Sequence, residues 1–358
     1  MRSPPVSVAQ VVTGLTAGLA LLYFLRSILI PLVVAFVLAV LVDALVRWIV
    51  RRWPRLPGWS VAAVAGAIIG PCAFGAIYVI AQGGVEIVDQ GPALLSRLDS
   101  LVEQFGENLG IDEPVHLSTI VGNVSVPRIA GGVLSSAQEV VSGVFVMLVY
   151  FAFMLSSRAR IAPKVRNIAA SSENAERIKA GMTRIAADIE TYVWVQTLTG
   201  LMLSGASWLF MAAVGLDNAI FWTVILFLLS FIPIIGVTVG SIAPALFALL
   251  QFPTYWQALV IFAGIQIVAF IVGNFIYPRM QADTQNIDPV ATLLALSFWG
   301  FIWGIAGAFL AVPLTLMLMM VCAQFESSRW VAVLLSNDGG PSFPNVKALR
   351  GRRRQERD

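Results

Sequence analysis

Residues 219–250 read AIFWTVILFLLSFIPIIGVTVGSIAPALFALL, and this uncharged stretch decides the fold. As one straight helix it would be roughly 48 Å long, whereas the hydrocarbon core of a bilayer is about 30 Å thick. Pro233 removes a backbone hydrogen bond near its middle, and Gly236 relaxes the chain just beyond. The stretch therefore predicts a broken membrane helix, either a kinked span or a re-entrant hairpin.

A second over-long apolar stretch, 290–323, has a glycine-rich middle that includes Gly304 and Gly307. One ordinary span, 256–277, separates the two broken segments. Irregular backbone at membrane depth is tolerated only where protein buries it or where it lines a wet cavity. In secondary transporters, paired interrupted segments indicate the substrate site. The alternative is that both stretches are merely kinked, packed helices.

The composition extends this interpretation to the whole chain. Hydrophobic residues make up 58% of the sequence, charged residues 12%, and the mean hydropathy is +0.84. Soluble proteins are about 45–50% apolar and about 25% charged. We therefore predict an all-α integral membrane protein with about eight transmembrane segments. These segments include the broken or re-entrant helices of the C-terminal half. We also predict a small helical insert outside the cytoplasm. The first apolar run is expected to be retained rather than cleaved.

The charge distribution predicts an orientation in a bacterial inner membrane. Basic residues gather in 47–57, in 157–190 and in the C-terminal tail, whereas 83–139 is acidic. The positive-inside rule places the basic segments in the cytoplasm and the acidic one outside. The predicted organisation is 1–82, N-terminal membrane helices; 83–139, extracytoplasmic insert; 140–156, membrane helix; 157–190, basic amphipathic cytoplasmic segment; 191–325, transport region; 326–358, cytoplasmic tail.

Candidate solute contacts follow from the breaks and from the polar residues near them. Free N–H and C=O groups at a helix break bind polar ligands without a side chain. The ordinary span adds the side-chain amides of Gln266 and Asn274, and Arg279 follows it. The alternative role of Arg279 is to reach the lipid headgroups. The candidate substrate-binding residues are Pro233, Gly236, Gln266, Asn274, Arg279, Gly304 and Gly307.

Other chemistries find little support in the sequence. His116 is the only histidine and has no partner at metal-ligand spacing, and Cys72 and Cys322 lie far apart in apolar runs. No nucleophile–base pair or catalytic carboxylate pair lies in the apolar segments. The basic helix is typical of a membrane surface rather than of a nucleic-acid patch. We therefore expect no enzyme, no cofactor, no metal site and no nucleic-acid partner.

Four motifs together resemble the autoinducer-2 exporter family of bacterial membrane proteins. They are Phe231-Ile-Pro-Ile-Ile-Gly-Val-Thr-Val-Gly, Gly273-Asn-Phe-Ile-Tyr-Pro-Arg-Met, Asp288-Pro-Val and Trp303-Gly-Ile-Ala-Gly-Ala-Phe-Leu-Ala-Val-Pro-Leu. The resemblance covers residues 8–325 and is strongest over 225–320. It implies a homo-oligomeric transporter with re-entrant segments. Members of the family are associated with export of autoinducer-2, and others with Na⁺(Li⁺)/H⁺ antiport.

Three functions remain open at this stage. The first is a secondary exporter of a small polar organic solute, with autoinducer-2 as one candidate. The second is Na⁺(Li⁺)/H⁺ antiport, which requires a carboxylate that exchanges protons; Asp288 and Asp283 are the ion-coupling candidates if their connector folds inward. The third is a non-transporting membrane scaffold. The connector 280–288 is more acidic than in many relatives, which leaves the solute open.

Overall fold

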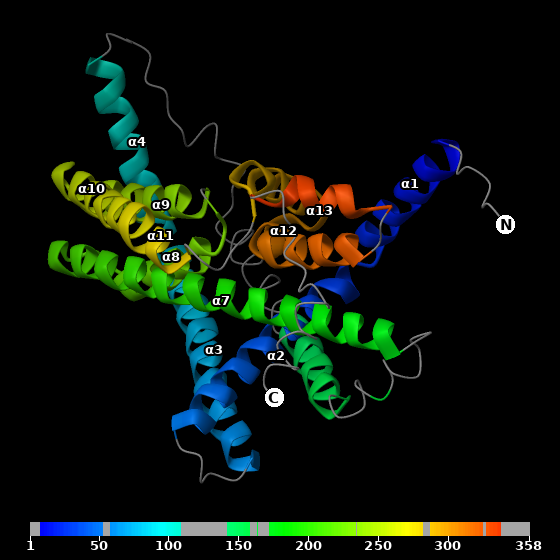
Figure 1. The fold of residues 1–358 in the computed structure, drawn as a ribbon. Helices are drawn as coiled ribbons and strands as arrows, with labels where there is room; N and C mark the ends of the chain where they lie inside the picture. The colour runs from blue at the N-terminus through cyan, green and yellow to red at the C-terminus, as the bar shows by residue number, and fades with distance from the viewer. Residues whose placement is uncertain are drawn as a thin grey trace. The chain divides into compact units, whose positions relative to one another are not determined.

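The computed structural model describes residues 8–52, 58–108, 142–157, 163, 172–233, 235–281, 287–324 and 327–337. Regular structure in these ranges is helical throughout (Figure 1). The helices are α1 (Val8–Phe24), α2 (Arg26–Arg52), α3 (Gly58–Asp89), α4 (Gly91–Asn108), a helix over Ser142–Ser157, α7 (Ser172–Val214), α8 (Ala219–Ser230), α9 (Ile235–Gln251), α10 (Trp256–Ile271), η1 (Val272–Ile276), α11 (Tyr277–Gln281), α12 (Pro289–Gln324) and α13 (Arg329–Leu335).

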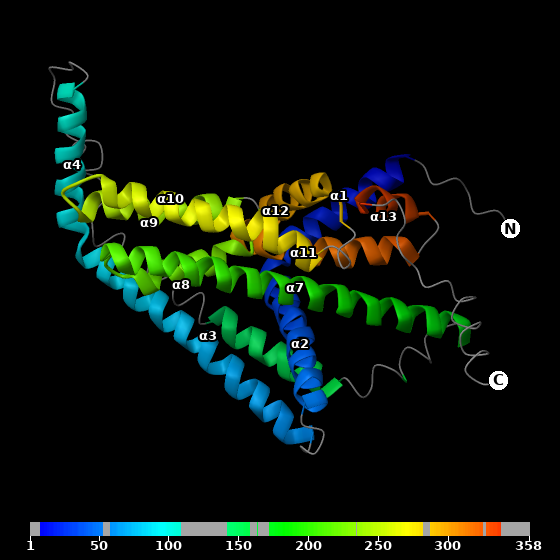
Figure 2. The ribbon, with the colours of Figure 1, turned by 60° about the vertical axis from the view of Figure 1, so that its left-hand side comes forward.

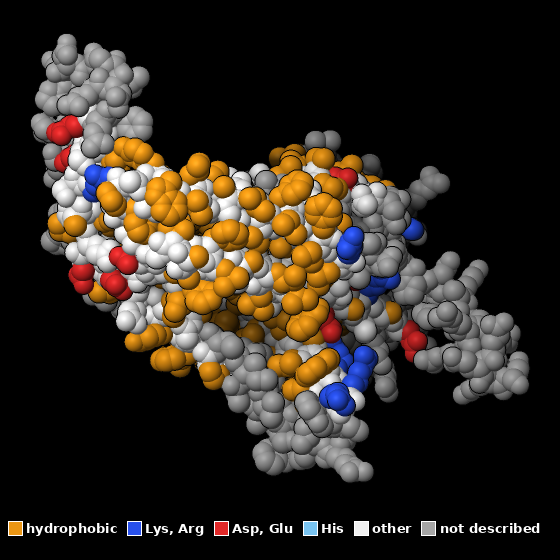
Figure 3. All heavy atoms as spheres, turned by 90° about the vertical axis from the view of Figure 1, so that its left-hand side faces the viewer, with side chains coloured by type: hydrophobic (Ala, Val, Ile, Leu, Met, Phe, Trp, Pro, Cys, Tyr) orange, Lys and Arg blue, Asp and Glu red, His pale blue; other side chains and the backbone are white. Residues whose placement is uncertain are grey.

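Several of these helices are long and apolar enough to cross a membrane. Within the described residues they lie over Arg26–Arg52, Ala180–Val214, Trp256–Met280 and Pro289–Ala323, and shorter apolar helices accompany them. Hydrophobic side chains also dominate the described surface seen in Figure 3. On α10, for example, Leu259, Ile267 and Phe270 are all more than half exposed. A surface of this kind needs lipid or protein to cover it, so the predicted all-α integral membrane fold is confirmed.

The chain divides into two compact units, each assembled from separate stretches of sequence. The first unit contains residues 1–47, 144–194 and 283–358, and the second contains residues 48–143 and 195–282. Each over-long apolar stretch falls wholly inside one unit. Residues 219–250 belong to the second unit and residues 290–323 to the first.

In the second unit, 219–250 forms a helical hairpin and not a kinked span. Helix α8 ends at Ser230, the chain turns through residues 231–233, and α9 returns beside α8 (Figure 2). The base of the hairpin is closed by Gln251, whose amide accepts from the N–H of Asp217 at 2.9 Å and donates to the Gly215 carbonyl at 3.1 Å. Both ends of the segment therefore lie together. We call residues 219–251 the first hairpin.

The first hairpin is packed on both of its helices. Gly83 of α3 lies so close to Phe221 of α8 that an added Cβ would be 2.5 Å from the ring. On the α9 side, Arg97 of α4 donates to the carbonyls of Phe252 and Pro253, at 3.4 and 3.0 Å. Buried residues of α7, α8, α9 and α10 complete an apolar core around this hairpin. The α3–α4 arm thus belongs to the same body as the first hairpin.

In the first unit, α12 is likewise two helices, folded back at Gly304. This glycine has φ 64° and ψ −143°, outside the helical region. The indole N–H of Trp299 donates to Thr315 Oγ1 over 3.2 Å, although sixteen residues of straight helix would separate them by about 24 Å. We call residues 289–324 the second hairpin. Both over-long segments are therefore hairpins, which resolves the alternative left by the sequence.

The base of the second hairpin is joined to α13. The N–H of Asp288 donates to the carbonyl of Leu335 over 3.1 Å, and α13 packs along α12. Because α13 follows the end of the hairpin, its beginning and its end lie near one another. The hairpin therefore enters and leaves on the same side of its unit.

Two helices run past the predicted segment boundaries. The amphipathic segment 157–190 and the next span are not separate over their described residues, because α7 runs without a break from Ser172 to Val214. At about 1.5 Å per residue α7 is roughly 64 Å long, so about half of it extends beyond a bilayer core. The N-terminal membrane helices were predicted over 1–82, and the last of them, α3, continues to Asp89. Residues 109–139 of the predicted insert lie outside the described residues.

The hairpin geometry predicts which residues share a side of the membrane. In a variant with both native cysteines replaced by serine, Asp217→Cys and Thr254→Cys should react with an impermeant maleimide from the same side, because Gln251 holds the two ends of the first hairpin together. The measurement is labelling of intact cells against inside-out vesicles, with Arg279→Cys as the control for the opposite side. Labelling of positions 217 and 254 from opposite sides would contradict the hairpin.

Candidate functional site

The tip of the first hairpin brings two helix ends together. Gly236, the second residue of α9, lies so close to α8 that a Cβ there would be 1.7 Å from the Leu229 carbonyl oxygen. Only glycine permits this approach, and it lets the returning chain cover the end of α8. Gly236 also donates its N–H to the carbonyl of Ile232, and Pro233 lies between them in the turn. The structure therefore places Pro233 and Gly236 in one tip.

The tip of the second hairpin is built in a similar way. A Cβ at Gly307 would lie 1.9 Å from the Trp299 carbonyl oxygen and 2.8 Å from Cβ of Trp303. Gly304 makes the turn itself with its positive φ. The indole of Trp303 then donates to the carbonyl of Leu22, near the end of α1, over 3.0 Å. Gly304 and Gly307 thus share the second tip, and Trp303 fastens that tip to α1.

Each tip offers the chemistry of opposed helix ends. In both hairpins the first helix arrives with its carbonyl end and the second leaves with its N–H end. The carbonyl end of a helix carries partial negative charge and the N–H end carries partial positive charge. A polar solute could therefore be bound by backbone groups of both signs, without a charged side chain.

The candidate residues of the ordinary span lie along one helix in the second unit. Gln266 is exposed on α10 within its own unit. Asn274 lies in the π-helical segment η1 and donates from Nδ2 to the Phe270 carbonyl over 2.9 Å. Arg279 is exposed on α11, beyond that segment. A π-helical turn inside a helix frequently marks a functional position, which favours the region around Asn274.

Of the two carboxylate candidates, only Asp288 lies in the described structure, where it caps a helix. Asp288 accepts from the N–H groups of Val290 and Ala291 at 2.8 and 3.2 Å, so it caps the N-terminus of α12. Pro289 follows at the first helical position, where proline is favoured. A structural role therefore accounts for Asp288. Asp283 lies outside the described residues. Among the residues that could be searched, no cluster could hold a metal ion.

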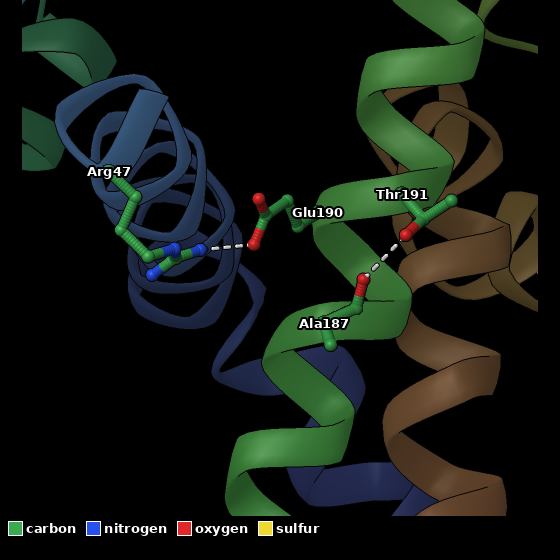
Figure 4. Close-up of polar contacts among 4 residues, drawn as sticks. All are labelled: Arg47, Ala187, Glu190 and Thr191. Atoms are coloured by element: carbon green, nitrogen blue, oxygen red, sulfur yellow. Dashed lines mark hydrogen bonds and ion pairs between the residues drawn. The ribbon is translucent and has the colours of Figure 1, made fainter. Parts of the chain in front are cut away.

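An ion pair joins α2 and α7 in the first unit. Arg47 donates to Glu190, and in Figure 4 the two side chains point toward each other from neighbouring helices. One residue further along, Thr191 donates its hydroxyl to the carbonyl of Ala187 in the same helix. Arg47 and Glu190 side chains are 52% and 30% exposed, so the pair contributes modestly to stability. The sequence could not pair residues so far apart.

The sequence reasoning also missed the side chains that fasten the hairpin tips. Gln196 of α7 donates from Nε2 to the Ser230 carbonyl at the end of α8. Trp303 fastens the second tip to Leu22. The available signal for Gln196 was an amide in an otherwise apolar span, because such groups usually find a hydrogen-bond partner on another helix.

With this geometry described, comparison with known proteins decides the family. The model of the AI-2E family transporter matches residues 14–326. The chain belongs to this transporter family. It is therefore a multi-pass membrane transporter, which confirms the resemblance inferred from the four motifs.

Several bacterial proteins are similar to this transporter over nearly their whole lengths. The AI-2 transport protein TqsA of Escherichia coli (strain K12) is 25% identical over 88% of this chain and 91% of its own. YhhT of the same strain is 23% identical over 93% of this chain and 94% of its own. PerM of that strain is 24% identical over 89% of this chain and 93% of its own. These identities support a shared family and leave the solute to be tested.

The capping geometry predicts how substitutions at Asp288 behave. Asp288→Ala should destabilise the protein by about 1 kcal/mol because two N–H groups at the start of α12 lose their acceptor. Asp288→Asn should change stability little, since asparagine caps as well as aspartate. Thermal unfolding in detergent measures both variants. Ion-driven proton flux lost in a stable Asp288→Asn protein would contradict a purely structural role and would favour antiport.

Proposed function

We propose that this AI-2E family transporter exports a small polar organic solute across the bacterial inner membrane, and that the two hairpin tips form its solute-binding elements. The observation that supports this most directly is the construction of the tips. In each, a glycine places backbone carbonyl and N–H groups of two helices against one another. Helix breaks at membrane depth are tolerated where protein buries them or where they line a wet cavity, and in secondary transporters paired breaks mark the substrate site.

The charge distribution supports an uncharged or weakly charged solute. Between Asp217 and Arg279 the sequence contains no Asp, Glu, Lys or Arg, and the same holds from Pro289 to Phe325. A charge at the centre of a bilayer costs at least about 2.5–3.5 kcal/mol, so a fully ionised solute would need a counter-charge there. Autoinducer-2, the solute named for TqsA, is therefore the first candidate to test.

The remaining parts of the proposal follow the sequence. The basic segments 47–57, 157–190 and 326–358 are placed in the cytoplasm and the acidic segment 83–139 outside. Two re-entrant hairpins flanking one crossing of α10 fit this orientation, since a hairpin adds no crossing. The proposal also includes that the transporter acts as a homo-oligomer and that H⁺ or Na⁺ is its coupling ion.

The hairpin glycines give the test of function. Gly236→Ala and Gly307→Ala each force a methyl group against a backbone carbonyl, at 1.7 and 1.9 Å, so the tips must shift. Overpacking of this kind costs about 1–3 kcal/mol, and we expect solute flux to fall about tenfold or more. The measurement is efflux from proteoliposomes loaded with autoinducer-2 or with a panel of neutral polyols, with and without ion gradients.

Gly205→Ala is the matched control, because nothing lies within 4 Å of a Cβ at that position of α7. It should keep normal flux and stability. Absence of flux for every solute under every gradient in the unmodified protein would overturn the proposed function and favour a membrane scaffold. Normal flux in stable Gly236→Ala and Gly307→Ala proteins would remove the tips from the site.

A further inference from the structure

The carbonyl groups at the end of α8 account for how the first hairpin is held. A helix leaves its last four carbonyls without partners inside the helix. Here Phe227 accepts from the Ser230 hydroxyl, and Leu228 and Leu229 accept from the N–H groups of Phe231 and Ile232. These three bonds lie within the hairpin. The fourth carbonyl, that of Ser230, accepts from Gln196 of α7.

The surroundings of Gln196 show that α7 is shaped to receive this tip. One turn further along α7, Gly200 lies against α8: a Cβ there would be 2.6 Å from Ser230 Oγ and 3.3 Å from the ring of Phe227. Thr199 and Ser230 are buried, and Gln196 is half-buried. The hydrogen bond from Gln196 thus links α7 to the hairpin tip across a close contact in which Gly200 lies against Ser230 and Phe227.

We propose that Gln196 is a positioning residue that latches the tip of the first hairpin, and that the latch must open for a solute to reach the backbone groups of the tip. This inference rests on the proposed function. A tip that moves away from α7 leaves the Ser230 carbonyl without its donor. A hydroxyl group of a polar solute can replace that donor, so the solute favours the open state. An apolar solute cannot, because the carbonyl would stay unpaired in a dry site.

The glutamine is well suited to a latch that opens. It donates one neutral hydrogen bond, which is weak enough to be exchanged, and it carries no charge that would have to be moved within the membrane. Gly200 gives the tip a closely fitting seat, so the tip returns to one position.

Cysteine reactivity at the tip tests the latch without any transported solute. Ile235, the first residue of α9, is 52% exposed and becomes the reporter as Ile235→Cys in a protein whose native cysteines are serine. The rate of reaction with a small water-soluble methanethiosulfonate is measured in proteoliposomes. Gln196→Leu should raise this rate about two- to tenfold, as expected when one neutral hydrogen bond is lost. Gln82→Leu, the same change on an exposed amide of α3 that lies outside the proposed solute site, should leave it unchanged.

Gln196→Glu separates a latch from a general packing effect. A protonated glutamic acid donates an O–H to the Ser230 carbonyl, whereas an ionised one repels it. At each pH, the reaction rate of the reporter cysteine in the Gln196→Glu protein is divided by the rate in the protein that keeps Gln196. This ratio should be near one at low pH and should rise as the pH increases. Because this change is followed within one folded protein, it tests the latch even if Gln196→Leu fails to fold.

The outcomes distinguish the latch from the proposed function. Equal rates with Gln196 and Gln196→Leu, or a pH-independent ratio for Gln196→Glu, would overturn the latch while leaving transport untouched. A latch that responds as expected in a protein that moves no solute would overturn the proposed function, and the tip would then be a conformational switch of another kind.

Discussion

The structure depends on one constraint, which is that backbone carbonyl and N–H groups inside a bilayer must have partners. A straight helix satisfies them automatically, and a broken helix does not. In the first hairpin each of the four last carbonyls of α8 has a donor. In the second, the glycine at 307 lets the returning helix lie directly over the carbonyl of Trp299. The breaks are therefore closed by specific contacts, and these contacts fix where each tip lies.

The two hairpins solve this problem with the same means. Gly236 lies against the carbonyl of Leu229 and the side chain of Ile232, and Gly307 lies against the carbonyl of Trp299 and the side chain of Trp303. A fully buried proline follows in the second helix of each hairpin, Pro244 in one and Pro313 in the other. The tips differ in how they are fastened. The first accepts a bond from a side chain of α7, and the second donates one to the backbone of α1.

The sequence predicted the positions of the breaks because they depend on local chemistry. Excess length, Pro233, Gly236 and the glycines near 304 locate both tips to within a few residues. It could not choose between kink and hairpin, because that choice depends on contacts between distant residues. The closure of the first hairpin by Gln251 and the bond between Trp299 and Thr315 are of this kind. In the candidate site, Gln196 was missed for the same reason, because its importance comes from the Ser230 carbonyl, which lies 34 residues away.

The capping role of Asp288 bears on the choice between solute export and antiport. Asp-Pro before an apolar run is a local signal for a helix start, yet the carboxyl group drew attention as an ion-coupling candidate. Its Oδ1 atom accepts two backbone N–H groups at the start of α12, so a helix-capping role accounts for the residue. The two hairpins themselves contain no ionisable carboxyl group. Their polar groups are amides, indoles, hydroxyls and backbone carbonyls, and carbonyls at a helix break can coordinate a cation as well as accept from a neutral solute. The missing carboxyl group therefore counts against proton exchange within the hairpins, whereas their carbonyl groups suit either a polar solute or a cation.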